Sequence, residues 1–273
     1  MLSQSEKANI FRKLHQLNYA FVIPNPWDIG TARLLAQLGF EALATTSAGY
    51  AFSVGQSDNT VDRDEMLRHV TEIVEATDLP VSADLENGYG DDPKIVSETI
   101  RLASVTGLAG ASIEDMKSDH TIYDLAIARE RIQAAAEVVR SLPYPFTLTA
   151  RAENYLVGRP DLEDTIQRLQ TYQEAGADVL YAPGLKTKEE IMSVVRSVDR
   201  PVNVIMGLQG VRLTVEELSE IGVKRISVGS ALSRAALGAF LRAAHEMKKQ
   251  GTFTFAEEAV PYKEINAMFQ KPG

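Results

Sequence analysis

The stretch PVSADLENGYGDDPKIVSETIRLASVTGLAGASIED, residues 80–115, holds one complete unit of the predicted fold. A short β-branched and apolar run at 80–85 is followed by a segment with apolar residues at i, i+3 and i+4, at 94–107, and then by a second apolar run at 110–115. This order predicts a strand, a helix and a second strand. Both strands are too apolar to face water, which is typical of parallel strands covered by helices.

Eight such apolar runs recur along the chain. They lie at residues 20–24, 41–46, 80–85, 110–115, 146–151, 178–183, 201–206 and 225–230. Segments with helical spacing lie between them, and four glycines suit helix C-caps: Gly39, Gly107, Gly176 and Gly222. We therefore predict an α/β fold, a (β/α)8 barrel of the TIM type. An open doubly wound sheet alternates in the same way, but the first turn, PNPWDIG, lacks the glycine-rich pattern of that fold.

The length of the chain suits this architecture. A (β/α)8 barrel commonly needs about 250 residues, and the chain has 273 residues with no internal linker, repeat or low-complexity tract. We predict a single domain over residues 1–273. The tail from about residue 251 carries apolar and aromatic positions of its own. It is predicted to be a docking segment, with a frayed terminus as the alternative.

The composition excludes several classes of protein. The formal net charge is -9 at pH 7, and no run of Lys and Arg forms the basic surface that nucleic acids require. Cysteine is absent, which excludes disulfides, thiolate metal sites and a thiol nucleophile or acid. The N-terminus has no apolar signal core, and no apolar run approaches the roughly 20 residues of a membrane span. We expect a cytoplasmic protein with neither a nucleic acid nor a membrane as its partner.

Charged residues stand at the ends of three neighbouring predicted strands. In a barrel of this type the active site lies at the C-terminal ends of the strands, so charges there are functional candidates. The strand period of two places residues 84 and 86 on one side, and 151 and 153 likewise. The candidates are Asp84 and Glu86, Glu114 and Asp115, and Arg151 and Glu153.

These acids predict a metal site. Carboxylates that converge on one point raise one another's pKa unless a cation lies among them. An oxygen-only site with few protein ligands suits Mg²⁺ or Mn²⁺, whereas zinc would need His or Cys, which this rim lacks. The alternative is that the acids cap the following helices or pair with Lys and Arg.

Other polar features are less specific. The turn TTSAGYA (45–51) offers hydroxyl and backbone N–H groups to a carboxylate or phosphate, or simply uses Gly49 for its backbone freedom. The segments 207–211 and 228–238 resemble the phosphate sites of many barrels but also fit ordinary helix capping. Among the histidines only His120, in the polar loop MKSDHTIYD, could reach the site. The other three are expected to pack or to lie at the surface: His15, His69 and His245.

Several motifs occur together in the order of a known family. The chain carries PNPWD, TTSAGYA, GQSDN, DLENGYG, SIED and TARAENYLVG, which begin at residues 24, 45, 55, 84, 112 and 149. From residue 24 to about residue 238 the sequence resembles the isocitrate lyase/phosphoenolpyruvate mutase superfamily. The resemblance implies a Mg²⁺-dependent enzyme that handles small 2-oxo or 2-hydroxy carboxylates through a metal-bound enolate. It also implies a homotetramer in which the last helices exchange between subunits.

The resemblance further implies roles for individual residues. Asp84 matches the direct metal ligand, and Glu86 and Glu114 match acids that hold the metal mainly through its waters. Arg151 matches the guanidinium that grips the substrate carboxylate, and Asp58 matches a carboxylate near the leaving group. The full set of expected substrate-binding residues is Ser47, Ala48, Gly49, Asp84, Arg151, Glu153 and Asn203, and the other catalytic candidates are Tyr50 and His120.

The loop at 116–123 departs from the family. Isocitrate and 2-methylisocitrate lyases carry K-[KR]-C-G-H there, with the Cys as acid/base, and phosphonate mutases carry a K-x-N-S type gate. This chain has MKSDHTIYD and no Cys, so both of those lyase activities are excluded. We predict a carbon–carbon lyase or decarboxylase, resembling oxaloacetate decarboxylase-like or carboxyphosphonoenolpyruvate phosphonomutase-like members. A C–P bond enzyme and a non-catalytic 2-oxo acid binder remain alternatives, whereas a Schiff-base aldolase would need a strand-end Lys that is missing.

Overall fold

The computed structural model describes residues 2–270 and contains one parallel sheet of eight strands. The sheet order is β1-β8-β7-β6-β5-β4-β3-β2. The strands are β1 (Phe21–Ile23), β2 (Leu43–Ala44), β3 (Val81–Asp84), β4 (Gly110–Glu114), β5 (Thr147–Arg151), β6 (Val179–Tyr181), β7 (Val202–Ile205) and β8 (Arg225–Ser227). Between the end strands the Ala44 N–H donates to the Pro24 carbonyl at 3.1 Å, so the barrel is nearly closed. The (β/α)8 prediction is confirmed.

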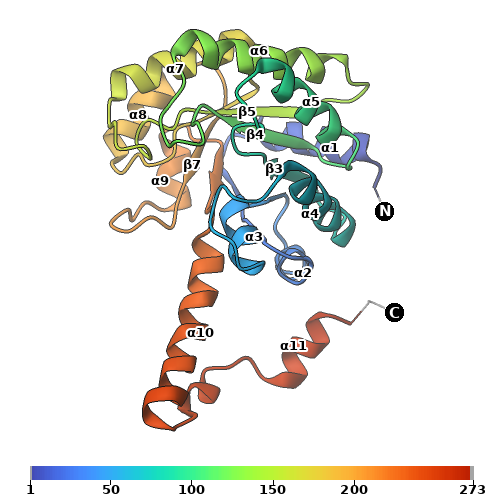
Figure 1. The fold of residues 1–273 in the computed structure, drawn as a ribbon, viewed down its shortest axis with the longest axis vertical. Coiled ribbons are helices and arrows are strands. Elements are labelled where there is room, and N and C mark those ends of the chain that lie inside the picture. Colours follow the sequence, from blue (N-terminus) through green and yellow to red (C-terminus); the bar gives the residue numbers. More distant parts are fainter. Residues whose placement is uncertain (1, 271–273) are drawn as a thin grey trace.

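The helices of the chain surround the sheet as the outer layer of the barrel, apart from the last ones, which extend away from it (Figure 1). They are α1 (Gln4–Leu14), α2 (Ile29–Gln37), α3 (Ser47–Ser53), α4 (Arg63–Ala76), α5 (Pro93–Ser104), α6 (Leu125–Ser141), α7 (Leu162–Ala175), α8 (Lys188–Arg196), α9 (Val215–Glu220), α10 (Ala231–Gln250), η1 (Thr254–Glu257) and α11 (Tyr262–Met268). Many begin at a side-chain cap, as where Asp62 accepts from the backbone of Glu65 at the start of α4. Each predicted apolar run contains one strand, which is shorter than the run.

The four glycines predicted to cap helices all lie in the left-handed region. Their φ values are between 86° and 110°, which a residue with a side chain adopts only at a cost. Gly176 has a second reason to lack a side chain, because a Cβ there would lie 2.9 Å from the Cβ of Ala136 on α6. A glycine at this position therefore both ends α7 and allows α6 and α7 to pack closely.

The C-terminal part of the chain leaves the barrel. Helix α10 projects away from the other elements, and α11 turns back towards α2 (Figure 1), where the side chain of Gln37 contacts the carbonyl of Met268. Large apolar side chains are exposed along this part, among them Leu237, Phe240, Leu241, Phe253 and Tyr262. The assignment of this tail as a docking segment stays a prediction. No helix within residues 2–270 has the length and apolar character needed to cross a bilayer.

Candidate active site

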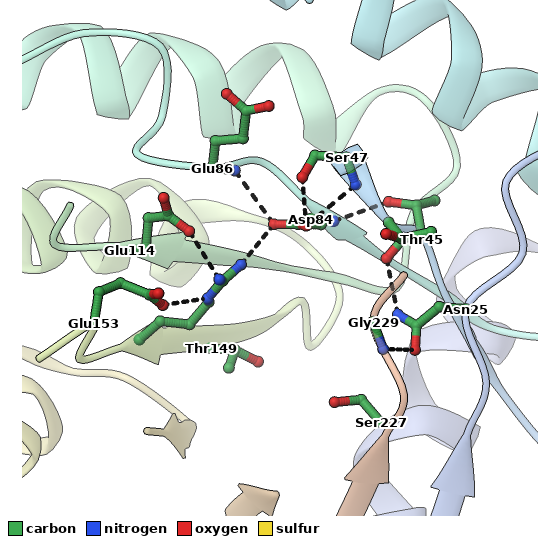
Figure 2. Close-up of polar contacts among 12 residues, drawn as sticks. Asn25, Thr45, Ser47, Asp84, Glu86, Glu114, Thr149, Glu153, Ser227 and Gly229 are labelled. Atoms are coloured by element: carbon green, nitrogen blue, oxygen red, sulfur yellow. Dashed lines mark hydrogen bonds and ion pairs between the residues drawn. The ribbon is translucent and has the colours of Figure 1, made fainter. Parts of the chain in front are cut away.

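Arg151 lies at the centre of a cluster of acids at the C-terminal end of the barrel (Figure 2). Its Nη1 lies 2.8 Å from Asp84 Oδ1, its Nη2 lies 3.0 Å from Glu114 Oε2, and its Nε lies 2.8 Å from Glu153 Oε1. The four side chains come from the ends of β3, β4 and β5, which are neighbours in the sheet. The structure therefore brings four of the six charged residues predicted at this rim into contact, and one guanidinium neutralises part of the charge of three acids.

Glu86 adds a further carboxylate to this group. It is a non-glycine residue with a φ of 49°, in the left-handed region, where backbone strain is common at functional sites. Burial, and then the charges of Asp84 and Asp58, raise the pKa of Glu86 to about 8. Figure 2 shows its carboxylate directed away from Asp84 and Glu114, and within residues 2–270 it forms no ion pair with Arg151. Glu86 is therefore a buried acid whose charge the guanidinium does not neutralise directly.

Glu114 and Glu153, which both contact Arg151, also have raised pKa values. Burial raises the pKa of Glu114 well above its usual value, and it raises the pKa of Glu153 to about 7, although Arg151 opposes both shifts. The second oxygen of Glu153, Oε2, is buried and has no hydrogen-bond partner among residues 2–270. Four carboxylates around one guanidinium leave an excess of negative charge, which a bound cation would relieve.

The donor set fits a hard divalent cation. Every side chain here that could be a ligand offers oxygen, which suits Mg²⁺ or Mn²⁺. Within residues 2–270 no three acid or histidine side chains lie together as a ready-made metal cage, since the guanidinium of Arg151 lies between them. Mg²⁺ does not need such a cage, because it usually takes one or two carboxylates and keeps several waters.

The segment TTSAGYA begins a short helix, whereas the sequence predicted a turn. Thr46 accepts from the Gly49 N–H at 3.2 Å and so caps α3, which means that this N–H is already used. Ser47 faces the acids, and its N–H and Oγ lie 3.2 Å and 2.9 Å from Asp84 Oδ2. A Cβ at position 49 would lie 3.2 Å from the Cβ of Trp27. Gly49 therefore has a packing role.

A cavity of about 210 Å³ opens beside this cluster and contains most of the predicted substrate-binding residues. A cavity of about 600 Å³, lined by Arg12, Tyr144 and Arg200, contains none of the rim acids and is not the candidate site. The smaller cavity includes the predicted residues Ser47, Ala48, Asp58, Asp84, Arg151 and Asn203, and also Tyr181, Arg225, Ser227 and Arg234, which the sequence did not single out.

Two of the catalytic candidates do not line this cavity. The ring of Tyr50 stacks on His69, with centroids 3.8 Å apart, and its hydroxyl lies 3.3 Å from Glu65 Oε1. His120 is exposed at the tip of the loop after β4, where its φ is 61°. Neither residue lines the cavity described above.

Asp115 has a structural position. Its carboxylate accepts from the Tyr172 hydroxyl at 2.5 Å and from Arg168 Nη1 at 3.0 Å on α7, and its Oδ1 accepts from the Glu153 N–H at 2.8 Å. This is the pairing that the sequence left open as the alternative. Asp115 therefore positions the Glu153 backbone and does not face the cavity.

The backbone N–H groups that follow β8 are already bound by a residue that the sequence did not single out. Asn25, which follows β1, accepts from the N–H groups of Val228 and Gly229, both at 2.9 Å, and donates to the Thr45 carbonyl at 3.0 Å. These backbone donors are therefore not free for a phosphate. Asn25 joins the ends of β1, β2 and β8 where the barrel closes (Figure 2).

Comparison with known proteins places this site in context. A family model described as phosphoenolpyruvate phosphomutase matches residues 11–248. The crystal structure of a Burkholderia cenocepacia protein, provisionally described as a lyase/mutase, has a TM-score of 0.96 and 62% identity, covering 98% of this chain and 97% of its own. An uncharacterised Mycobacterium tuberculosis protein is 33% identical over 262 residues, 94% of this chain and 95% of its own.

More distant relatives carry the names of activities. The structure of 2,3-dimethylmalate lyase, described as a PEP mutase/isocitrate lyase superfamily member, has a TM-score of 0.84 and 26% identity, covering 98% of this chain and 95% of its own. Other relatives are named 2-methylisocitrate lyase and oxaloacetate decarboxylase. These names describe lyases and a decarboxylase, and each of them gives a different small acid as the substrate.

Proposed function

The chain belongs to the phosphoenolpyruvate phosphomutase family, and on that premise we propose that it is a Mg²⁺-dependent carbon–carbon lyase or decarboxylase. Its substrate would be a small 2-oxo or 2-hydroxy dicarboxylate, as the names of the 2,3-dimethylmalate lyase and oxaloacetate decarboxylase relatives suggest. The observation that carries the proposal is the group of four carboxylates, Asp84, Glu86, Glu114 and Glu153, around the single guanidinium of Arg151.

The metal would be held by Asp84 directly and by Glu86 and Glu114 through bound water. This set suffices, because Mg²⁺ takes few carboxylates and keeps its waters, and Mn²⁺ accepts the same ligands. A bound cation would act as a Lewis acid towards the negative charge that develops on a substrate oxygen as the bond at C3 breaks.

Arg151 would bind the substrate carboxylate. Its Nη1 now contacts Asp84 at 2.8 Å, so a cation beside Asp84 would compensate that acid and leave one arm of the guanidinium for the substrate. Guanidinium groups bind carboxylates through paired N–H donors. Ser47, which donates to the other oxygen of Asp84, would fix the orientation of that carboxylate.

Asp58 is the proposed proton donor to the carbon where the bond breaks. It lines the cavity, and its Oδ1 lies 3.5 Å from Ser47 Oγ. Burial, and then the charge of Asp84, raise the pKa of Asp58, which favours the protonated form that a general acid needs. The predicted catalytic roles of Tyr50 and His120 would require the loop at 116–123 or α3 to move.

Product analysis tests the proposal. Purified protein is incubated with oxaloacetate, 2,3-dimethylmalate and phosphonopyruvate, with Mg²⁺ and with a chelator, and the products are identified by NMR. We expect Mg²⁺-dependent release of pyruvate or another carboxylic acid. Release of phosphate would select C–P chemistry, and ligand binding without any turnover would select a binding protein. Turnover that survives the chelator would contradict the proposed metal dependence.

We also propose a homotetramer in which α10 packs against a neighbouring subunit. Phe240 on this helix is 66% exposed, and Leu241 is 52% exposed. Large apolar side chains exposed together on one helix are typical of a protein interface. Light scattering on the full chain gives the mass directly, and a monomer at micromolar concentration would contradict this assignment.

A further inference from the structure

The interior of the barrel below the acid cluster is polar. In most (β/α)8 barrels the inner layers are filled by branched apolar side chains. Here small polar side chains from five different strands are buried instead, and they are Ser82, Ser112, Thr149, Asn203 and Ser227. Four of them line the 210 Å³ cavity, with Thr149 beneath. Their small size is what leaves this space open under the rim.

Arg225 lies at the floor of this space. It is 5% exposed and reaches from β8 across the barrel interior. Its Nε donates to Asn203 Oδ1 at 2.8 Å, its Nη2 donates to Thr149 Oγ1 at 3.1 Å, and its Nη1 lies 3.5 Å from His15 Nε2. All three partners are uncharged groups when His15 is neutral, and burial lowers the pKa of His15 to about 3.

Arg225 therefore carries a buried charge without a counter-charge. Within residues 2–270 it forms no ion pair, whereas Arg151 has three carboxylates within 3.0 Å. Burial lowers the pKa of Arg225 to about 10, so the guanidinium stays charged at neutral pH. Buried charges are normally paired because an isolated one is costly. The missing negative charge is thus a feature that the protein alone does not explain.

The place of Arg225 relative to Arg151 suggests what supplies that charge. Thr149, which Arg225 contacts, lies two residues before Arg151 on the same face of β5, a separation of about 7 Å along a strand. Both guanidiniums line one cavity. A cavity of about 210 Å³ is below the usual range of about 300–1,000 Å³ for drug-sized ligands. Its occupant is therefore a short molecule.

We propose that Arg225 binds the second carboxylate of the substrate, and that it makes the enzyme selective for short dicarboxylates over monocarboxylates. This inference rests on the proposed function, in which the acid cluster and Arg151 hold the 2-oxo or 2-hydroxy end. Asn203 positions the guanidinium through the 2.8 Å contact to Nε. Entry of the far carboxylate supplies the counter-charge that the free protein lacks.

Arg234 offers a second cation in the same cavity. It lies in the first turn of α10, is exposed, and lines the mouth of the cavity. An exposed guanidinium is already solvated by water, so it gains less from a ligand than a buried one does. This contrast makes Arg234 the matched comparison for Arg225.

Calorimetry with two ligands of the same carbon skeleton tests the inference. Malate and 2-hydroxybutyrate share the 2-hydroxy acid end and differ in a carboxylate or a methyl at the far end. Both are titrated, in the presence of Mg²⁺, into the wild-type protein and into Arg225→Met, Arg225→Lys and Arg234→Met. NMR of the recovered ligand shows whether either was turned over. The measurement needs no catalysis, so it can succeed or fail independently of the proposed reaction.

We expect the wild-type protein to prefer malate by about thirtyfold or more, as is typical when a buried charge loses its partner. Arg225→Met should bring the two affinities within about threefold of one another, Arg225→Lys should lie between, and Arg234→Met should keep the wild-type preference. Arg225→Met should still fold, because removal of an uncompensated buried charge costs little. Equal affinities in the wild type, a preference that persists in Arg225→Met, or a preference lost in Arg234→Met would each overturn the inference, and the first needs no variant.

Discussion

The guanidinium of Arg151 lies 2.8 Å from the same Asp84 carboxylate that is the proposed direct metal ligand. The Asp84 carboxylate therefore belongs both to the ion pair and to the proposed metal site. In the metal-free chain the pair lowers the repulsion among the rim acids. When a cation is bound, the same pair would be partly released. This exchange links metal binding to the availability of Arg151.

Replacement of Asp84 by Asn should abolish most of the activity. The substitution removes the direct ligand while keeping size and one hydrogen-bond acceptor, and loss of one preorganised electrostatic group typically costs about 100- to 1,000-fold in kcat. Steady-state kinetics over a Mg²⁺ series measures the change. Asp64→Asn is the matched control, because that carboxylate is 76% exposed on α4. Equal activity of the two variants would contradict the role of Asp84.

Replacement of Arg151 by Gln should destabilise the protein in a way that Mg²⁺ partly reverses. The variant leaves Asp84, Glu114 and Glu153 without their shared cation, and breaking a buried ion pair costs about 3–5 kcal/mol in the free energy of unfolding. Urea unfolding at one protein concentration, with and without Mg²⁺, measures this. Arg101→Gln, at an exposed pair with Glu98, should change little. A loss that Mg²⁺ leaves untouched would argue against a cation site among these acids.

The protein should lose stability as the pH falls below 6.5, in part through His15. Burial, helped by the charge of Arg225, lowers the pKa of His15 from 6.5 to about 3. Between these values the unfolded chain binds a proton that the folded chain does not, so the free energy of unfolding falls by up to about 1.4 kcal/mol per pH unit for this group. Above pH 6.5 the whole contribution is present.

Urea unfolding at pH 7.5, 6.0 and 5.0 measures this slope. The variant His15→Gln keeps an amide donor for the Phe11 carbonyl, which His15 Nδ1 now contacts at 2.8 Å, but it cannot take up a proton. The free energy of unfolding of this variant should therefore fall less steeply as the pH falls, by up to about 1.4 kcal/mol per pH unit, which corresponds to one proton. His69, whose pKa burial lowers to about 4, supplies a similar slope that remains in the variant. Identical slopes in the two proteins would show that His15 is protonated in the folded state.

Replacement of Phe240 by Glu should weaken the proposed assembly. The side chain is 66% exposed on α10, so a charge there costs little in the isolated subunit but would be buried in an interface. Light scattering across a dilution series should show dissociation at a protein concentration at least about tenfold higher than for the wild type. Val105→Glu is the control, since Val105 is 77% exposed at the end of α5. If the wild type and both variants keep the same mass across the dilution series, α10 does not take part in the interface.

The sequence predicted the eight strands and the rim acids because both follow from local patterns. Apolar runs mark buried parallel strands, and topology then brings the strand ends together. It missed the helical start at Ser47, because a single Thr cap decides between a turn and a helix. It also missed Arg225, since a charge at the start of a strand is read as lying at the far end of the barrel. The strands are tilted and Arg225 is long, so its guanidinium reaches the interior.

Asp115 and Glu114 illustrate a related limit. They are adjacent at the end of one strand, and spacing alone made both of them candidates, but the strand alternates its faces. Glu114 therefore faces Arg151, whereas Asp115 faces Arg168 and Tyr172 on α7. The partners on α7 lie more than fifty positions away in the chain, and no local sequence pattern indicates this contact.

The left-handed conformation of Glu86 has a consequence for how such a chain can change. Glycine would adopt a φ of 49° without strain, and it would also remove a carboxylate whose burial is unfavourable. Substitutions at this position that favour folding are thus the ones that discard the acid. Selection for stability and selection for catalytic activity would therefore favour different residues at position 86, a trade-off expected where strain is kept for function. A thermostabilised descendant of this protein would be expected to lose Glu86 first unless its activity were screened as well.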